Sequence, residues 1–581
     1  MRFSFTIIGG GLTATAMLKH FVDQVGQAAE QALLDPAHIE IQVFEKQETF
    51  GPGFPHCQKY LMPFHVTNMC AMDMGIVSGR PGDFQKWVDQ NLRALQDRLP
   101  EFSTFFSSPD IIDRPCNHYP RAIMGEYLKT RFQDAVRDAR ELGMHVGLYV
   151  RCEVTNLDEK EDCVSLTIRN LESGKFFFKK SDRVLLATGH WFNENEDGGY
   201  FPSPWPAQNL MDKIPCGEKV AVIGTSLSAI ETVLTLTSDG KFIRDHLSEL
   251  FYLPPAHPRK IVLYSRKGLL PKVRGRIGRH KNRILTRNSV DRLLSEHRGQ
   301  LTLDHLFEVV NEELEAAYGR PIDWDNVLNP TGSAADLLAQ HIDDALSGDS
   351  PSGVLIWQSV LQQLLPMARK LYNNLSMSER ERFEKDYATL FFTYAATQPT
   401  INAEKLLALL KSGHVEVHSL GKAYRLQKNE ETGLYDFIFI NRLGNMTTDS
   451  YRYVVNARGQ EKSIVSNPSK LAKNSVASGV VQIAEIPQRD YPEILDEKVP
   501  REPYRRVRPY KTGSIWIDTE THGIMKLMPD GTAIPSKTIY AVGAMTRGQI
   551  IDASMANGSV RSTATIAKNL IAHLKKVAKG S

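Results

Sequence analysis

The chain has 581 residues, which exceeds what a single hydrophobic core usually contains, so we expect two or three domains. Hydrophobic residues make up 42% and charged residues 24%, ordinary values for a soluble globular protein. The formal net charge of +3 averages over local clusters and says little alone. Because no apolar run approaches the ~20 residues of a membrane helix and no leader precedes the first strand, we expect a cytoplasmic protein without a membrane span.

The first predicted element is an apolar strand that runs directly into Gly9-x-Gly11-x-x-Ala14 and then into a helical pattern. Gly9 suits a tight turn, Gly11 lets the backbone approach a pyrophosphate, and Ala14 allows close packing of helix on strand. Leu12 and Thr13 then open the helix whose N-terminus faces the anion. A lone glycine motif is a weak signal, but this one has the strand and the helix that a dinucleotide site requires.

Residues 39–45 form the predicted second strand, which ends in Glu45 and is followed by Lys46. A carboxylate at this position can accept both hydroxyls of an adenosine ribose. The spacing from Gly11 exceeds the usual ~20 residues, and a longer crossover helix over residues 20–36 accounts for the excess. The alternative is a surface Glu at a strand end.

A second strand, turn and helix start spans residues 220–229 and contains Gly224, Ser226, Leu227 and Ser228. The next strand, residues 261–266, ends in Arg266, which can bind a 2′-phosphate and so favours NADPH over NADH. Ser226 stands where a glycine is expected, which adds a side chain where the pyrophosphate approaches. The two units together predict two dinucleotides, with the second site less certain.

The remaining chain alternates short strands with a helical stretch. Strands are predicted near residues 147–152, 164–169, 184–189, 415–418, 436–441, 453–459 and 538–543, and helices at 303–317, 333–346, 353–375, 377–394, 402–411 and 553–577. We therefore expect an α/β protein with two Rossmann-like dinucleotide-binding domains. The first, FAD-type domain would be discontinuous (1–215 and 450–581), the NAD(P)-type domain would comprise 216–285 and 413–449, and 286–412 would be a helical insert.

Several further motifs carry a family resemblance. They are Gly51-Pro52-Gly53-Phe54-Pro55, His65-Val66-Thr67-Asn68-Met69-Cys70-Ala71, Gly82-Asp83-Phe84-Gln85-Lys86-Trp87, the segment from Tyr119 to Leu128, Ser265-Arg266-Lys267-Gly268-Leu269-Leu270-Pro271 and the helical region from Trp357 to Phe383. Together they resemble the bacterial FAD/NAD(P)-binding two-dinucleotide flavoproteins, which are related to the flavin-dependent N-hydroxylating monooxygenases. The chain departs from that pattern at Ser226, at Tyr394–Pro399 and at Arg458.

The resemblance implies bound FAD and an NADPH site. The residues expected at FAD are Gly9, Gly11, Leu12, Thr13, Ala14, Glu45, Lys46, Gly53, Asn68, Arg121, Gly189, Gly543, Arg547, Gly548 and Asp552; those expected at NADPH are Gly224, Ser226, Leu227, Ser228 and Arg266. The catalytic residues are unknown, with Asn68, His56 and His65 as candidates. A surface salt bridge for Arg121, a turn role for Asn68 and structural roles for both histidines remain open.

Two segments are rich in cations. Residues 259–287 contain no Asp or Glu, and residues 501–511 interleave aromatic residues with cations. Either segment is a solvated basic loop, or it contacts a polyanion such as RNA, an anionic carrier or a phosphorylated substrate.

The six cysteines include no Cys-x-x-Cys pair, and the chain has no zinc, Walker A or His-Glu-x-x-His spacing, so no metal and no disulfide framework are expected. We expect an FAD-dependent NADPH oxidoreductase, a monooxygenase that acts through a C4a-peroxyflavin on a small-molecule or carrier-linked substrate. The alternatives are a flavin reductase or oxidase without oxygen transfer, and a non-catalytic flavin-binding partner or redox sensor.

Overall fold

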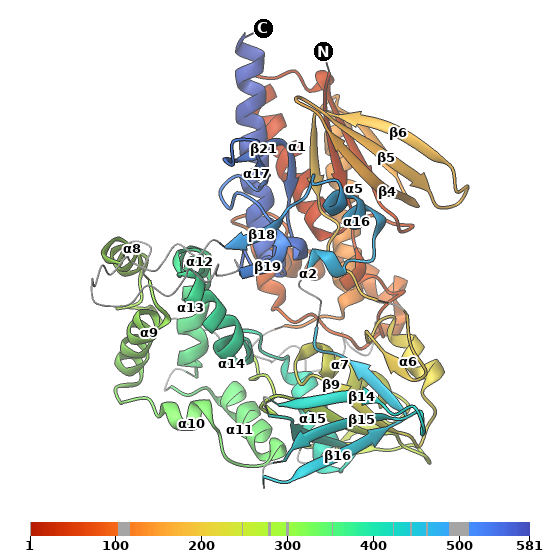
Figure 1. Cartoon of the computed structure of the whole chain (residues 1–581), viewed down its shortest axis with the longest axis vertical. Helices are drawn as coiled ribbons and strands as arrows, with labels where there is room; N and C mark the ends of the chain where they lie inside the picture. The colour runs from red at the N-terminus through yellow and green to blue at the C-terminus, as the bar shows by residue number, and fades with distance from the viewer. Residues whose placement is uncertain are drawn as a thin grey trace, which may run out of the picture.

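The computed structural model shows two α/β units, one above the other in Figure 1, with a helical block at their side. Both termini of the chain lie in the upper unit. The structure describes residues 2–102, 117–193, 195–246, 248–276, 280–297, 301–350, 353–421, 423–441, 444–459, 463–486 and 510–580.

The upper unit contains a six-stranded sheet in the order β20-β21-β7-β1-β2-β3. All pairs are parallel except β20 with β21. The apolar strand β1 is buried because helices pack on one face of the sheet and a three-stranded antiparallel sheet packs on the other. The strands are β1 (Phe3–Ile8), β2 (Ile39–Phe44), β3 (His145–Tyr149), β7 (Arg183–Leu186), β20 (Gly523–Leu527) and β21 (Ala533–Ala541), and the covering sheet is β4 (Cys152–Glu159), β5 (Val164–Asn170) and β6 (Phe176–Ser181).

Three helices cover the first face: α1 (Leu12–Glu30), α5 (Arg121–Glu141) and α17 (Ala556–Gly580). Met17, Phe21 and Val25 recur at helical spacing on α1 and are fully buried against the sheet. Helix α17 packs directly against α1, so the helix after the N-terminal turn and the C-terminal helix share one core. Peripheral elements are α2 (Asp83–Arg98), α16 (Lys470–Ala477), β18 (Ile483–Ile486) and β19 (Tyr510–Ile515).

The lower unit repeats this plan. Its five strands are parallel in the order β13-β12-β9-β17-β8, with helices on one face and an antiparallel sheet on the other. The strands are β8 (Tyr200–Phe201), β9 (Lys219–Ile223), β12 (Lys260–Ser265), β13 (Val415–Ser419) and β17 (Tyr453–Asn456). The covering elements are α6 (Ala207–Lys213), α7 (Leu227–Leu236), α15 (Thr400–Lys411), β14 (Tyr424–Lys428), β15 (Tyr435–Ile440) and β16 (Met446–Tyr451), with the hairpin β10 (Lys241–Arg244) and β11 (Leu250–Leu253) at the side.

The helical block has its own apolar core. It consists of α8 (Arg287–Glu296), α9 (Leu303–Tyr318), α10 (Trp324–Leu328), α12 (Ile356–Asn374), α13 (Met377–Arg382), a π-helical turn (Phe383–Tyr387) and α14 (Ala388–Ala395). Helix α11 (Ala334–Ser347) follows α10 in the chain but packs against α15 in the core of the lower unit. The segment predicted as a helix over residues 402–411 is α15, but it packs on the lower sheet.

The fold class predicted from the sequence is confirmed. Two short strands lie in a different unit from the one expected. Both β8 and β17 fall within the predicted FAD-type domain (1–215 and 450–581), but they pair in the lower sheet. The reason is that β17 pairs over its full length with β9, which the strand pattern alone does not reveal. The other predicted boundaries stay a prediction.

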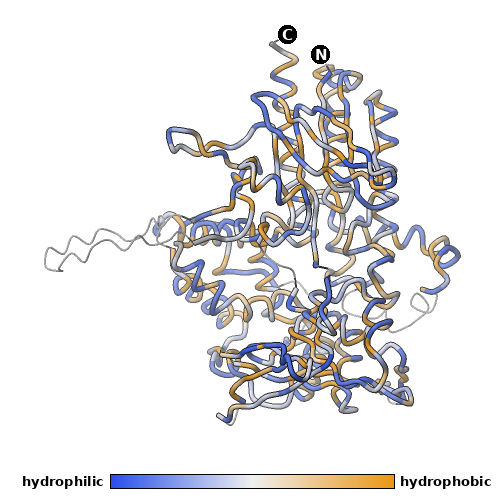
Figure 2. Tube along the Cα trace, turned by 45° about the vertical axis from the view of Figure 1, so that its right-hand side comes forward, coloured by the Kyte–Doolittle hydropathy of each residue, from blue (hydrophilic) through white to orange (hydrophobic). Residues whose placement is uncertain are grey.

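Hydrophobic and hydrophilic residues alternate along the helices in Figure 2. Among the residues that the structure describes, none of the helices combines the length and the apolar character needed to cross a lipid bilayer.

Candidate functional site

The first glycine turn connects β1 to α1 at the carboxyl edge of the upper sheet. Gly9 has a φ of +100°, and a Cβ on it would lie 2.3 Å from the carbonyl oxygen of Ala187 at the end of β7. Only glycine fits this position. Ala14 is fully buried, so a small residue allows α1 to pack against the sheet.

Gly11 is the N-cap of α1 and brings the turn against a second loop. A Cβ on Gly11 would lie 3.3 Å from the Cα of Gly53, and a Cβ on Gly53 would lie 3.1 Å from the Cα of Gly11. No side chain caps α1, so the N–H groups of its first turn, at Leu12 and Thr13, have no capping acceptor. Free helix N–H groups behind a glycine turn form an anion-binding site.

Glu45 lies beside this turn, directly after β2. Its carboxylate accepts hydrogen bonds from the backbone N–H of Gly10 at 2.6 Å and of Gln47 at 2.8 Å. Burial raises the pKa of Glu45, and these two hydrogen bonds oppose the shift. A carboxyl oxygen has two lone pairs, so acceptor capacity remains for a ribose hydroxyl. The neighbouring Lys46 is exposed.

The loop after β21 faces the start of α1. Gly543 has a φ of +94°, and a Cβ on it would lie 3.8 Å from Oγ1 of Thr13. Gly548 (φ +111°) and Gly189 (φ +66°) also adopt conformations that favour glycine. The guanidinium of Arg547 lies 5.6 Å from the ring centroid of Phe392, which links this loop to the helical block.

Asp552 does not face an open site. Its carboxylate accepts from Arg369 of α12 at 2.9 Å and also pairs with Arg561 of α17. Burial opposes the charge of Asp552, but the two guanidinium groups hold its pKa below the usual value. Asp552 therefore connects the helical block to the C-terminal helix.

Arg121 was expected at the FAD pyrophosphate, but its side chain has another partner. Its Nη2 lies 2.7 Å from Oε1 of Glu231 on α7, and its Nε donates to the carbonyl of Val66 at 3.1 Å. The exposed fractions of the Arg121 and Glu231 side chains are 12% and 2%. Because both charges are buried together, Arg121 connects the upper unit to the lower one in this structure.

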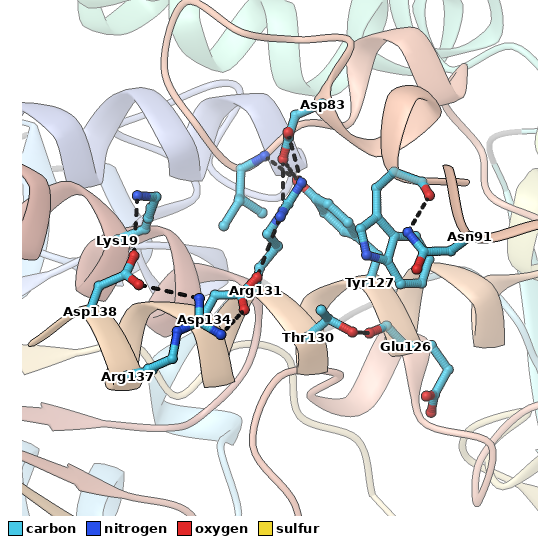
Figure 3. Close-up of polar contacts among 12 residues, drawn as sticks. Lys19, Asp83, Asn91, Glu126, Tyr127, Thr130, Arg131, Asp134, Arg137 and Asp138 are labelled. Carbon is cyan, nitrogen blue, oxygen red and sulfur yellow. Dashed lines mark hydrogen bonds and ion pairs between the residues drawn. The ribbon is translucent and has the colours of Figure 1, made fainter. Parts of the chain in front are cut away.

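Polar contacts farther along α5 fix the direction of this helix (Figure 3). Asp83, at the start of α2, accepts from the hydroxyl of Tyr127 at 2.6 Å and from Arg131 at 3.0 and 3.1 Å. Arg131 also lies 3.4 Å from Asp134. These contacts position the N-terminal end of α5, where Arg121 begins the helix.

His65 also lies between the two units. Its Nε2 lies 3.0 Å from Oγ1 of Thr235 on α7, and its Nδ1 accepts from the N–H of Met62. Burial lowers the pKa of His65 to about 3, with the nearby charge of Arg121 acting in the same direction. A neutral, hydrogen-bonded imidazole fits the structural alternative better than a proton-transfer role.

Two other histidines have unsatisfied nitrogens. Burial lowers the pKa of His56 to about 3 and that of His190 to about 4, with Arg121 and Arg547 contributing to the latter. In the described part of the chain, Nδ1 of each is buried without a hydrogen-bond partner. Sequence reasoning missed His190, although its position directly after the Ala-Thr-Gly189 strand end was a usable signal.

Asn68 lies half-buried in the loop before Ala71. Its side chain has no hydrogen bond to any residue that the structure describes, so the proposed contact of Asn68 with the flavin stays a prediction. Cys70 on the same loop takes part in a disulfide bond, which the cysteine spacing did not predict. Cys57, Cys152, Cys163 and Cys216 are free thiols.

The second glycine turn connects β9 to α7. Gly224 has a φ of +124°, and a Cβ on it would lie 2.7 Å from the carbonyl oxygen of Ala457 at the end of β17. Ser226 is the N-cap of α7, and neither its hydroxyl nor another side chain caps the helix. The N–H groups of the first turn, at Leu227 and Ser228, are thus also without a capping acceptor.

Arg266 follows β12 on the exposed edge of this second turn. Its Nη1 donates to the carbonyl of Lys385 in the π-helical turn at 3.4 Å. Thr225 donates to the carbonyl of Leu269 at 2.6 Å, which fixes the loop that carries Arg266. The predicted contact of Arg266 with a 2′-phosphate is compatible with this exposure and stays a prediction.

The basic segment 259–287 is not a continuous surface. Arg259 and Arg274 are 3% and 7% exposed, and Lys272 is half-buried. Arg259 donates to two backbone carbonyls and pairs with Asp239 at 2.7 Å. These three cations face inward, whereas others of the segment, such as Arg266, Lys267 and Lys281, are exposed. The predicted polyanion or RNA contact has no support from the similar proteins, and residues 501–509 lie outside the described residues.

These features fit a dinucleotide at the first turn. A tight turn at which a Cβ would collide, followed by an uncapped helix N-terminus, is what the backbone offers to a pyrophosphate. Gly9 and Gly11 form this turn, and Gly53 and Gly543 lie close to it, whereas Arg121 and Asp552 are engaged elsewhere.

Known dinucleotide-binding proteins resemble this chain in sequence and in fold. Residues 6–191 match the model of the FAD-NAD(P)-binding family. The uncharacterized protein YdhS of Escherichia coli (strain K12) is 24% identical over 439 residues, which cover 70% of this chain and 78% of that protein. Ornithine hydroxylase (PvdA) of Pseudomonas aeruginosa, in its reduced form, has a similar fold: its TM-score is 0.52 at 12% identity, covering 99% of this chain and 100% of that chain.

The matched region is an FAD/NAD(P)-binding domain, and the resemblance predicted from the motifs is confirmed. Both sheets and both turns are those of a dinucleotide-binding α/β fold, and the family match places an FAD-NAD(P)-binding region in the N-terminal third of the chain.

Proposed function

We propose that this protein is an FAD-dependent monooxygenase that takes its electrons from NADPH and acts on a small molecule. The observation that carries the proposal is the repeated turn: each sheet ends in a glycine turn with a positive φ, followed by an uncapped helix. The N-hydroxylase fold shared with ornithine hydroxylase favours oxygen transfer over simple reduction.

In this proposal the first turn holds FAD and the second holds NADPH. When bound, FAD accepts a hydride and makes oxygen reactive. The first turn of α1 and the loop at Gly543 orient the cofactor, and Glu45 accepts the ribose hydroxyls. Arg266 pairs with the 2′-phosphate of the nicotinamide dinucleotide.

Other residues of the chain prepare the site between the two units. Arg121–Glu231 and His65–Thr235 hold α7 against the upper unit, so both dinucleotides would approach from fixed positions. His56 and His190, which are neutral at physiological pH, offer hydrogen bonds at their Nδ1 atoms without introducing charge.

An anaerobic titration tests the proposal. Protein loaded with FAD is mixed with NADPH in the absence of oxygen, and loss of the oxidised flavin absorbance is followed. We expect complete bleaching by NADPH, faster than by NADH. Failure of both nicotinamides to reduce the flavin would contradict the proposed electron donor.

Stoichiometry then distinguishes the monooxygenase from a reductase or oxidase. With oxygen admitted, a monooxygenase consumes NADPH in step with an oxygenated product when its substrate is present. Free peroxide in proportion to NADPH, with every candidate substrate, would favour the oxidase alternative.

A further inference from the structure

A small pocket lies where the segment after β12 runs beside α11 and α14, two helices labelled in Figure 1. Its walls are largely apolar and include Leu270 from this segment and Leu337 and Leu338 from α11. The cavity volume of about 30 Å³ has room for about two water molecules, so only a very small molecule can enter. Two polar side chains, those of Lys272 and His341, also line this space.

Lys272 is a half-buried ammonium group without a carboxylate at contact distance. Its Nζ lies 2.6 Å from Nε2 of His341 on α11 and 5.1 Å from the ring centroid of Tyr394 on α14. Asp344 is the carboxylate whose charge acts on it, but the two form no ion pair in the part of the chain that the structure describes. Burial lowers the pKa of Lys272 to about 8, and the charge of Asp344 opposes this shift.

His341 is a neutral acceptor beside this lysine. Burial lowers the pKa of His341 to about 3, and the charge of Lys272 acts in the same direction. A lysine ammonium only donates hydrogen bonds, so Nε2 of His341 presents its lone pair to Nζ. The pair therefore places a proton acceptor at contact distance from an amine.

These surroundings make Lys272 a nucleophile near neutral pH. A lysine reacts through its uncharged amine, and a pKa of about 8 leaves about a quarter of the groups uncharged at about pH 7.5. For a lysine of ordinary pKa the uncharged fraction at this pH is about one in a thousand. Removal of water in an apolar pocket is a common way in which proteins activate a lysine.

We propose that Lys272 is a modification site for carbon dioxide, which adds to Nζ as a carbamate. Carbon dioxide is uncharged, occupies about the space of two water molecules and brings no leaving group, so it suits this small apolar pocket. Larger acyl donors exceed the space. The inference is independent of the proposed function, because it involves neither dinucleotide.

The reaction is balanced within the pair of side chains. The lone pair of Nζ forms a bond to the carbon of CO₂, one C–O π electron pair moves onto an oxygen, and a proton passes from Nζ to Nε2 of His341. The product is a carbamate anion beside an imidazolium, so the total charge does not change. Because the anion replaces the ammonium that lowers the pKa of His341, protonation of the imidazole becomes more favourable.

The segment that carries Lys272 also contacts the second glycine turn. Oγ1 of Thr225 in that turn donates to the carbonyl of Leu269, three residues before Lys272, at 2.6 Å. The backbone N–H of Lys272 donates to the carbonyl of Thr393 on α14 at 2.9 Å. A change of charge at Lys272 therefore occurs on the segment that joins the second turn to the helical block.

Labelled bicarbonate tests the assignment on the full-length protein. The protein is equilibrated with ¹³C-bicarbonate at about pH 8, where half of the Lys272 amines are uncharged, and the ¹³C NMR spectrum is searched for a carbamate carbonyl signal. We expect one such signal, which Lys272→Met abolishes because the aliphatic side chain remains but the amine is removed. Lys267→Met is the matched control and should keep the signal, because Lys267 is an exposed lysine on the same segment.

His341→Gln tests the proton acceptor. Glutamine keeps a polar side chain but does not become a cation, so we expect carbamate occupancy at a given bicarbonate concentration to fall about tenfold. A signal of full strength in this variant would contradict the role of His341.

A second measurement uses the unmodified chain and does not depend on how the variants fold. Potassium cyanate adds irreversibly to uncharged amines, and peptide mass spectrometry after limited reaction gives the rate at each lysine. At about pH 7.5 we expect Lys272 to react about tenfold or more faster than Lys267, because a much larger fraction of its amine is uncharged.

Three results would overturn the assignment: no carbamate signal at saturating bicarbonate, a signal that survives in Lys272→Met, or reaction of Lys272 with cyanate no faster than that of Lys267. None of these outcomes depends on FAD or NADPH. A failure of this inference is therefore distinguishable from a failure of the proposed function.

Discussion

The two glycine turns of this chain have the same backbone but different surroundings. Gly9 and Gly224 both have a positive φ and would both drive a Cβ into a carbonyl, that of Ala187 or Ala457. These carbonyls end the neighbouring strands β7 and β17. The first position of each turn is therefore restricted to glycine by its own sheet, independently of any ligand.

The N-cap positions differ in a more informative way. Gly11 has φ −84° and ψ −159°, and Ser226 has φ −93° and ψ −168°, so a side chain is sterically allowed by the backbone at both. At Gly11 a second loop approaches, with Gly53 within van der Waals contact. Glycine at position 11 is explained by the close approach of Gly53 and by the space that it leaves for a ligand. At the second turn, the side chain of Ser226 affects only the ligand that would bind there.

The largest effect on ligand binding is expected at the first turn. Gly11→Glu places a charged side chain between Gly53 and the pyrophosphate, and we expect FAD affinity to fall by about 100-fold or more, ~2.7 kcal/mol. Gly26→Glu is the control, because it lies on the same helix and meets only the side chain of Leu142. Equilibrium dialysis against FAD measures both. Equal retention of FAD by the two variants would show that the turn does not hold the cofactor.

The second prediction concerns the ion pair of Arg121 with Glu231, which connects the two units. Glu231→Leu leaves Arg121 buried without a counter-charge, and we expect the free energy of unfolding to fall by about 3 kcal/mol. Adding Arg121→Met should recover most of that loss. Urea unfolding of the single and double variants checks this. If the double variant were as unstable as the sum of both single ones, the pair would not act as a unit.

Acid should weaken the same connection. The pKa of His65 falls to about 3 in the folded protein, so the histidine contributes stability above the unfolded pKa of about 6.5 that is lost as pH falls toward 3. For this one group we expect a loss of about 2 kcal/mol between pH 7 and pH 5. His65→Gln should reduce the acid dependence of urea unfolding by that amount. An unchanged pH profile would remove His65 from this role.

The second turn should discriminate between nicotinamides. Arg266→Ala removes one charge-assisted contact, so we expect the KM for NADPH to rise about tenfold with little change for NADH. Steady-state reduction of the flavin by each donor gives both constants. An equal rise for both would defeat the assignment of Arg266 to the 2′-phosphate.

The smallest expected effect concerns Ser226, the position at which the two glycine turns differ. Ser226→Gly gives the second turn the glycine of the first, and we expect the KM for NADPH to fall about threefold, ~0.6 kcal/mol, because a side chain leaves the path of the pyrophosphate. FAD content should not change. A higher KM would mean that the Ser226 hydroxyl itself contacts the ligand.

Much of this architecture could be predicted from the sequence. The glycine turns, the apolar strands and the helical periodicity are local signals, and the segments 303–317, 333–346 and 377–394 are helical as expected. Strand pairing is not a local signal, which is why β17 was placed in the wrong unit. The sequence did not predict the antiparallel strands β14 and β16 for the same reason, because each is a strand only through its pairing with a partner strand.

The same distinction between local and distant signals applies to the site residues. The positive φ of Gly9 and Gly224 could be predicted, because it is a local backbone requirement, whereas their contacts with a ligand stay predictions. The ion pair of Arg121 could not be predicted, because its partner Glu231 is far away in the sequence and the same motif serves either a phosphate or an ion pair. The burial of Arg274 could not be predicted either, because the residues around it come from α12 and α14.

The central claim is that the first turn binds FAD through its backbone. The most direct measurement is the absorbance spectrum of the purified full-length chain after incubation with FAD and removal of the excess by gel filtration. We predict one tightly bound, oxidised flavin per chain, which Gly11→Glu loses and Gly26→Glu keeps. A chain that elutes colourless after incubation with excess FAD would contradict the claim.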